Sequence, residues 1–202
     1  MMNDMGSPPN FPSVIALAGP NGAGKSTAGP ALVRDTLGVQ EYVDADLLAR
    51  GVSPSDPART AIEAGKVMLR RLRELEKDKR SFAFETTLAS RSFAPWISQL
   101  IAQGWRFDLL FLWLPSENLA VARVQDRVRH GGHSVPEEVI RRRYRGGLRN
   151  FFRLYRPIAT SWLMYDNSGD VLRLIAAGAG KSVQQVSDAA AWEQISREFG
   201  NA

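Results

Sequence analysis

The stretch Gly19-Pro20-Asn21-Gly22-Ala23-Gly24-Lys25-Ser26-Thr27 fits the pattern G-x-x-x-x-G-K-[ST]. An apolar run over residues 13–18 precedes it and predicts a buried strand, and a helix-compatible stretch follows from residue 25 to about residue 37. In a strand–loop–helix setting, the backbone N–H groups of the loop and the N-terminus of the helix both face a bound phosphate. The stretch therefore predicts a nucleotide phosphate site, and a fortuitous glycine-rich turn is the alternative.

Two side chains at the end of this loop would contact ATP and Mg²⁺. Lys25 would reach the β- and γ-phosphates, and the Ser26 hydroxyl would be a ligand of Mg²⁺. The glycines allow the backbone to turn tightly and to approach the anion. We therefore expect the whole loop, from Gly19 to Thr27, to bind the nucleotide.

The composition indicates one α/β domain over residues 1–202, with residues 1–12 expected to be flexible. Hydrophobic residues make up 44% of the chain, which allows a sizeable core. The absence of cysteine excludes disulfides and thiol catalysis, and the presence of only two histidines argues against a histidine-rich metal site. The sequence shows no signal peptide and no run as long as a membrane span, so we expect a cytoplasmic protein without a membrane partner.

Strands and helices alternate along the chain, which predicts a three-layer α/β fold. The pattern favours a mostly parallel sheet with a core of five strands and with helices on both faces. Strands are expected at 13–18, 39–43, 81–84, 107–114 and 161–165, with a further short strand at 171–176. Helices are expected at 25–37, 58–79, 92–103, 117–129, from 136 onward and at 182–199.

Residues 116–156 form a basic segment that we interpret as a helical lid over the carboxyl edge of the sheet. Eight arginines lie between Val121 and Asn150, and a net charge of +5 also favours anionic partners. A guanidinium binds phosphate through two donors, so Arg127 and one or two of the arginines at 141–143 could cover the γ-phosphate. A nucleic-acid surface is the alternative, because aromatic residues lie at 144, 151, 152 and 155.

Carboxylates follow two of the predicted strands, at the edge where open α/β sheets place their sites. Asp44 and Asp46 follow the second strand, and Asp46 could be the general base or the cap of the next helix. Glu85 follows the third strand and could organise Mg²⁺ beside Ser26 or accept hydrogen bonds from substrate hydroxyls. Thr86 and Thr87 suit a polyhydroxylated ligand, but their hydroxyls could equally stabilise a turn.

With these motifs in order, the chain resembles the zeta-toxin family, whose studied members are P-loop kinases that phosphorylate UDP-N-acetylglucosamine. The resemblance extends from Gly19 to about Ser168. It rests on the loop at 19–27, Val43-Asp44-Ala45-Asp46, Phe84-Glu85-Thr86-Thr87-Leu88-Ala89, Arg123 to Arg127, Gly131-Gly132-His133-Ser134-Val135-Pro136, Arg142-Arg143-Tyr144 and Tyr165-Asp166-Asn167-Ser168. Asp44 is a departure, because the family often has Asn there, and a second carboxylate would disfavour ionisation of Asp46.

The resemblance implies a P-loop kinase-like fold and a role for each matching residue. Lys25 and Ser26 would hold the phosphates of ATP and Mg²⁺, with Glu85 or Asp44 near the metal. Asp46 would deprotonate the sugar hydroxyl, and Glu85, Thr86 and Thr87 would line the sugar-nucleotide pocket. The lid arginines would be Arg127 and Arg142, and Asn167 would lie near the nucleotide base.

Two alternatives to a nucleotide-sugar kinase stay open at this stage. One is a P-loop kinase of another small hydroxylated metabolite or an antibiotic, and the other is a nucleotide-gated NTPase that binds nucleic acid, which we disfavour. The sequence also leaves open whether an antitoxin protein is a partner.

Overall fold

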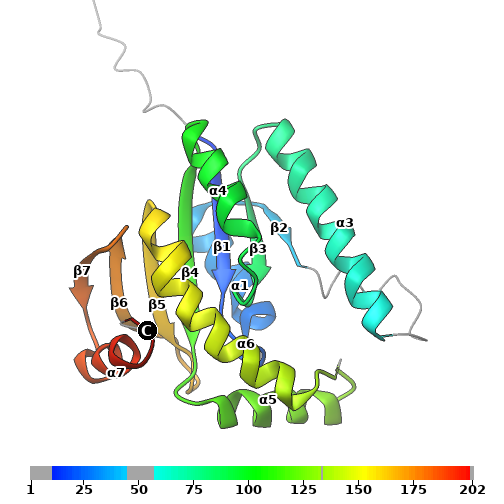
Figure 1. Ribbon diagram of the computed structural model, residues 1–202, viewed down its shortest axis with the longest axis vertical. Coiled ribbons are helices and arrows are strands. Elements are labelled where there is room, and N and C mark those ends of the chain that lie inside the picture. Colours follow the sequence, from blue (N-terminus) through cyan, green and yellow to red (C-terminus); the bar gives the residue numbers. More distant parts are fainter. Residues whose placement is uncertain (1–10, 45–56, 133, 201–202) are drawn as a thin grey trace, which may run out of the picture.

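The computed structural model describes residues 11–44, 57–132 and 134–200. Within these residues, one seven-stranded sheet has the order β2-β3-β1-β4-β5-β6-β7 (Figure 1). The strands are β1 (Ser13–Ala18), β2 (Glu41–Val43), β3 (Phe82–Thr86), β4 (Arg106–Trp113), β5 (Ser161–Asp166), β6 (Arg173–Ala179) and β7 (Ser182–Val186). The sheet places the carboxyl ends of β1, β3, β4 and β5 at one edge, because neighbouring strands from β2 to β5 are parallel.

The sheet has more strands than the five that we expected, because two antiparallel strands extend it at one end. One is β6, which confirms the further short strand expected at 171–176, and the other is β7, which was not expected. The five parallel strands themselves are confirmed. The predicted terminal helix at 182–199 is wrong in its first part, because residues 182–186 pair with β6 instead. Gly180, with φ of 51°, makes the tight turn that folds this segment back as a strand. A shorter helix, α7 (Ala189–Ile195), then begins where the Asp188 side chain accepts a hydrogen bond from the Ala191 N–H.

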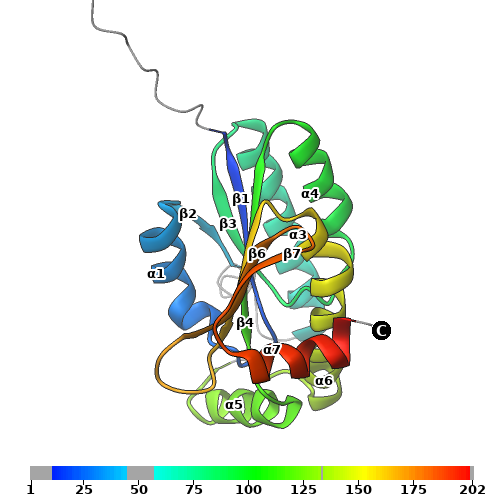
Figure 2. The same ribbon diagram turned by 90° about the vertical axis from the view of Figure 1, so that its left-hand side faces the viewer.

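Helices cover both faces of the sheet, as predicted (Figure 2). Helix α1 (Lys25–Leu37) lies on one face, and α3 (Pro57–Lys77) and α4 (Phe93–Ala102) lie on the other. Helices α5 (Glu117–Arg129) and α6 (Glu137–Asn150) form the predicted basic hairpin, and α5 crosses the carboxyl edge of the parallel strands. No described helix is long and apolar enough to cross a bilayer.

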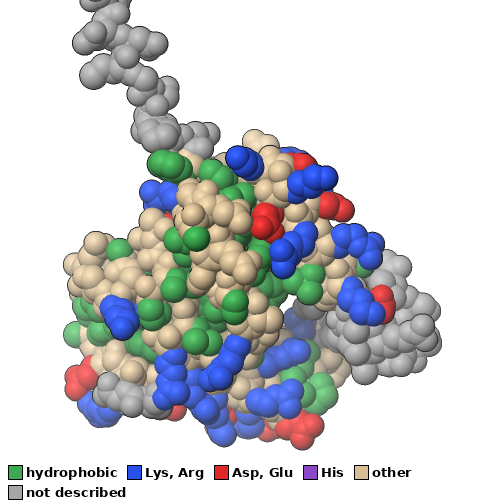
Figure 3. Space-filling view, turned by 45° about the horizontal axis from the view of Figure 1, so that its top comes forward, with side chains coloured by type: hydrophobic (Ala, Val, Ile, Leu, Met, Phe, Trp, Pro, Cys, Tyr) green, Lys and Arg blue, Asp and Glu red, His purple; other side chains and the backbone are tan. Residues whose placement is uncertain are grey.

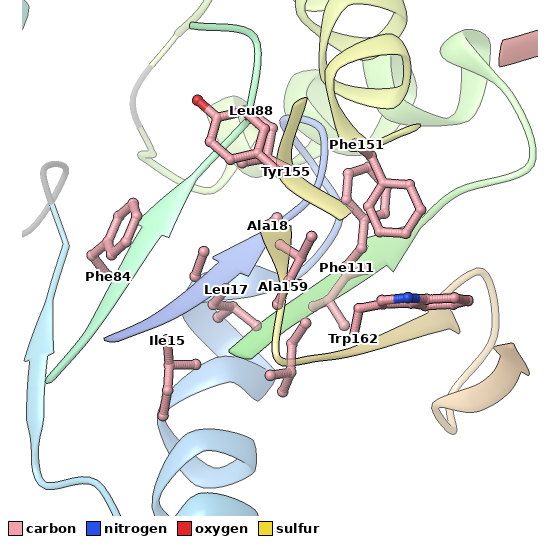
Figure 4. Packing of buried hydrophobic residues seen from close by; sticks show 14 of the residues in the cluster. Ile15, Leu17, Ala18, Phe84, Leu88, Phe111, Phe151, Tyr155, Ala159 and Trp162 are labelled. Carbon is pink, nitrogen blue, oxygen red and sulfur yellow. The ribbon is translucent and has the colours of Figure 1, made fainter. Parts of the chain in front are cut away.

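The core fixes the strand ends that carry the candidate site. Strands β1 and β4 are buried along almost their whole length, as expected for central strands covered on both faces. On one face, the ring of Phe111 lies edge-on to Phe151, with 5.2 Å between centroids, and Phe151 also packs against Trp162 (Figure 4). A short π-helical turn, Phe151–Tyr155, continues α6 directly into this core. The hairpin is therefore joined to the sheet by aromatic packing.

Candidate active site

The glycine-rich loop lies between β1 and α1, so the predicted strand–loop–helix arrangement is confirmed. Gly19, Gly22 and Gly24 have φ values of 144°, 80° and 78°, in the region that favours glycine. A Cβ atom on Gly19 would lie 2.3 Å from the carbonyl oxygen of Leu112, and one on Gly24 would lie 2.6 Å from Nδ2 of Asn167. Both positions therefore require glycine on conformational and on steric grounds.

Lys25 is held inside the curve of this loop. Its side chain is buried, and its ammonium donates hydrogen bonds to the carbonyl oxygens of Gly19 and Pro20, both at 2.9 Å. The same ammonium lies 3.8 Å from Oε1 of Glu85 at the end of β3. A fixed positive charge therefore stands at the N-terminus of α1, where the helix dipole also attracts an anion.

Glu85 joins the loop to the neighbouring strands. Its Oε2 atom accepts hydrogen bonds from the Ser26 hydroxyl at 2.9 Å and from the Tyr42 hydroxyl at 3.1 Å. Burial raises the pKa of Glu85, the Lys25 charge opposes that change, and the buried Asp44 adds to it. Burial and the charge of Glu85 likewise raise the pKa of Tyr42, so its phenol remains a donor to the carboxylate.

The predicted acidic residues at the end of β2 have different outcomes. Asp44 is buried at this position and lies close enough to Glu85 to influence its pKa. Asp46 lies outside the described residues, as does His133, so the assignment of Asp46 as general base stays a prediction.

The hydroxyls of Thr86 and Thr87 serve the turn after β3. Their Oγ1 atoms accept hydrogen bonds from the N–H groups of Leu88 and Ala89, at 3.0 and 3.5 Å. Leu88 has φ of 55°, which is unusual for a residue with a side chain and marks a tight turn. The turn interpretation of these threonines has direct support, and their contact with a substrate stays a prediction.

The arginines of the hairpin point in different directions. Arg143 reaches the phosphate loop, where its Nη1 atom lies 3.5 Å from Oδ1 of Asn21. Arg142 is exposed and lines an outward groove of α6. The stem of Arg127 packs beside Gly132, where a Cβ atom would lie 2.6 Å from its Cγ. Among the arginines at 141–143, Arg143 is the one with a described contact to the loop.

The structure removes the aromatic support for a nucleic-acid surface. Figure 3 shows one group of Lys and Arg side chains in the lower part of the molecule, toward the end where α5 and α6 lie, and others at the upper right. The four aromatic residues near these arginines are buried: Tyr144, Phe151, Phe152 and Tyr155. Buried rings cannot stack on bases, and their spacing belongs to the apolar face of the hairpin.

Asn167 follows β5 and lies against the phosphate loop from the opposite side to Glu85. Its Nδ2 donates to the carbonyl oxygen of Ala23 at 2.7 Å. Arg123 of α5 donates to the carbonyl oxygens of Asn167 and Ser168, at 2.7 and 2.8 Å. Tyr42 was not singled out from the sequence, and Arg123 was named only as the start of the motif Arg123 to Arg127, without a role of its own. Both residues act through contacts between distant segments.

A glycine-rich loop between the first strand and helix of a parallel sheet, with Lys25 and Ser26 at the helix start, defines a P-loop kinase-like fold. The model of the AAA domain family AAA_33 matches residues 14–148. The chain belongs to this family.

The chain is similar in sequence or in structure to several known proteins. An uncharacterized protein of Haemophilus influenzae is 28% identical over 130 residues, which cover 64% of this chain and 91% of that protein. A crystal structure of AvrRxo1-ORF1:-ORF2 with ATP is 17% identical with a TM-score of 0.69; the match covers 91% of this chain but only 63% of that one. A structure from the PezAT chromosomal toxin–antitoxin system of Streptococcus pneumoniae is 15% identical with a TM-score of 0.63, over 98% of this chain and 81% of that one. At these identities, the structural likeness establishes the fold alone.

Proposed function

We propose that the protein is an ATP-dependent, Mg²⁺-requiring kinase that phosphorylates a hydroxyl of a nucleotide sugar, with UDP-N-acetylglucosamine as the first candidate. One observation carries this proposal. The Lys25 ammonium, the Ser26 hydroxyl and the Glu85 carboxylate meet at the start of α1. Phosphoryl transfer needs such a set, because catalysis rests on positioning and on neutralising charge.

The residues present fit both ATP and Mg²⁺. The loop has no Cβ atom at Gly19, Gly22 and Gly24, which keeps its amides accessible to an anion. The Ser26 hydroxyl is the natural ligand of Mg²⁺ at this place in a phosphate loop, and Glu85 already accepts its hydrogen bond. When bound, Mg²⁺ would supply positive charge to the β- and γ-phosphates.

In the proposed reaction, an acceptor hydroxyl oxygen forms a bond to the γ-phosphorus, and the bond between that phosphorus and the β–γ bridging oxygen breaks. ADP leaves with the electron pair of the broken bond. The acceptor proton passes to a carboxylate, for which we propose Asp46. Lys25 would hold the β- and γ-phosphates, and Arg143, beside Asn21, would join Arg127 or Arg142 in stabilising the transferring group.

The nucleotide sugar is the acceptor that the zeta-toxin resemblance favours. Glu85 lies on the β3 side of the loop, where an acceptor hydroxyl could approach Lys25. One structural neighbour contains AvrRxo1-ORF1 together with AvrRxo1-ORF2, and another comes from the PezAT toxin–antitoxin system, which supports an antitoxin-like protein partner as part of this proposal. A cytoplasmic location would give the enzyme both ATP and nucleotide sugars.

The acceptor is tested by mass spectrometry. Wild-type protein is incubated with Mg²⁺-ATP and UDP-N-acetylglucosamine, beside other nucleotide sugars and free sugars. We expect one phosphoryl group to be added to UDP-N-acetylglucosamine by the wild type but not by Asp46→Asn. Arg129→Ala, which changes an exposed arginine at the end of α5, is the control and should also add it. Phosphorylation of another small hydroxylated compound instead would support the assignment as a kinase and contradict the nucleotide sugar as its acceptor. Normal turnover by Asp46→Asn would refute its role as base.

A further inference from the structure

Arg123 joins three segments that are distant in sequence. Its guanidinium, from α5, donates one hydrogen bond to the Asn167 carbonyl at 2.7 Å and another to the Ser168 carbonyl at 2.8 Å. Its stem packs on the phosphate loop, since a Cβ atom on Gly22 would lie 3.1 Å from the Cβ of Arg123. The rigid fork of a guanidinium suits two neighbouring acceptors, which a lysine cannot bridge in the same way.

Asn167, in the loop after β5, connects this loop to the phosphate loop and to β4. Its amide side chain donates to the Ala23 carbonyl, and its own N–H donates to the carbonyl oxygen of Trp113 at the end of β4. The loop after β5 is therefore bonded to the phosphate loop, to β4 and to α5. Without the guanidinium, the carbonyls of Asn167 and Ser168 would lose a charged donor, and the loop would gain freedom.

The sheet order indicates which part of a nucleotide would meet this loop. Strands β3 and β5 flank the central pair β1 and β4. Lys25 and Ser26 turn toward Glu85 on the β3 side, so the γ-phosphate and the acceptor belong there. The nucleoside of the same ATP must then extend to the other side of the loop, toward Asn167.

We propose that Arg123 is a positioning residue that fixes the loop after β5 for the nucleoside part of ATP. Arg123 acts through the carbonyls of Asn167 and Ser168, whereas Lys25 and the amides of the phosphate loop bind the phosphates. This inference rests on the proposed function, because it requires that the site binds ATP.

The test compares ATP with inorganic tripolyphosphate, which has the phosphates and no nucleoside. Calorimetric titrations with Mg²⁺ are run on wild type, Arg123→Ala, Arg123→Lys and Arg129→Ala. Arg129 is the control because it lies on the same helix with a side chain 73% exposed. We expect Arg123→Ala to weaken the binding of ATP about tenfold or more and the binding of tripolyphosphate less than about twofold. The ATP affinity of Arg123→Lys should lie between those of wild type and Arg123→Ala, because the lysine ammonium can donate to only one of the two carbonyls at a time.

Enzyme kinetics add a second readout. Arg123→Ala should raise the KM for ATP while kcat at saturating ATP stays within about threefold of wild type. If Arg123→Ala loses affinity for ATP and for tripolyphosphate equally, Arg123 acts on the phosphates and the positioning role is overturned. An unchanged ATP affinity in Arg123→Ala would overturn the role as well. If Arg123→Ala does not fold, Arg123→Lys decides by the same comparison. Wild-type protein that binds no ATP would overturn the proposed function and this role together. If the wild type binds ATP but Arg123→Ala does not lose ATP affinity selectively over tripolyphosphate affinity, the role alone is overturned.

Discussion

At the scale of single residues, Gly24 and Asn167 are fitted to each other. Gly24 has φ of 78° and leaves space for the Asn167 amide, which donates a hydrogen bond to the carbonyl oxygen of the preceding residue, Ala23. We predict that Gly24→Ala weakens ATP binding by about tenfold or more, because the added methyl would displace either the loop or Asn167. Titration of ATP into the purified variant measures the effect.

Gly38→Ala is the matched control for this substitution. Gly38 has φ of 66°, so alanine is strained there too, but among the described residues no atom beyond its two chain neighbours lies within 4 Å of its Cβ position. It should lose about 1 kcal/mol of stability and keep its ATP affinity. Equal ATP affinity in the two variants would contradict the steric account of Gly24.

Asp166 gives a pH-dependent prediction. Burial acts to raise the pKa of its carboxyl, but hydrogen bonds from Ser168 and Arg173 outweigh burial and lower it. A lowered folded-state pKa contributes stability that is present above the unfolded pKa of about 4 and is lost as the pH falls through the folded value. Asp166→Asn should therefore cost about 1–2 kcal/mol at neutral pH, and its difference from wild type should shrink below about pH 4.

Denaturant unfolding at several pH values measures this difference. Asp170→Asn is the control, because Asp170 belongs to the same turn and is exposed. A stability gap for Asp166→Asn that stays constant from pH 7 to pH values well below about 4 would contradict the proposed charge interaction.

At the scale of elements, α6 is fastened to the turn after β3. The amide of Asn150 donates to the Leu88 carbonyl at 2.7 Å, and the hydroxyl of Tyr155 donates to the Ser90 carbonyl at 2.6 Å. Gly147 lets the helix backbone approach this turn, since a Cβ atom would lie 2.3 Å from the Thr87 carbonyl oxygen. The part of the predicted lid formed by α6 is thus attached to the sheet.

This close approach predicts a large effect of one methyl group. Gly147→Ala should lower the free energy of unfolding by about 2–3 kcal/mol, because the new methyl meets backbone that cannot move aside easily. Gly65→Ala on α3 would meet no atom of the described residues within 4 Å of its Cβ position, apart from its own helix backbone and chain neighbours. This variant should be neutral or stabilising by up to about 1 kcal/mol. Equal thermal stability of the two variants would show that α6 is free to shift.

Sequence pattern predicts elements better than it predicts contacts between them. The glycine motif and the apolar runs identified the parallel strands, and with them Lys25, Ser26 and Glu85 at one edge. The pattern did not reveal β7, because the exposed segment Ser182–Val186 becomes a strand only by pairing with β6. The contacts of Tyr42 and Arg123 depend on register and packing, which no local signal contains.

At the scale of the whole molecule, the sheet order explains the arrangement of the site. With β1 and β4 in the centre, β3 delivers Glu85 to one side of the phosphate loop and β5 delivers Asn167 to the other. Helices α5 and α6 then bring Arg123 and Arg143 to the same loop from the carboxyl edge. One site is thereby assembled from distant segments of the chain.

We propose that this site transfers a phosphoryl group from ATP to a small acceptor. Acceptor-dependent ADP release by wild-type protein with Mg²⁺ is the first measurement to make, with Lys25→Ala as the comparison. We predict that an acceptor from the nucleotide-sugar panel raises ADP release, and that Lys25→Ala lowers the rate at least about a hundredfold while remaining folded. Equal, acceptor-dependent rates for wild type and Lys25→Ala would contradict the account, as would ATP binding without transfer to any small hydroxylated acceptor.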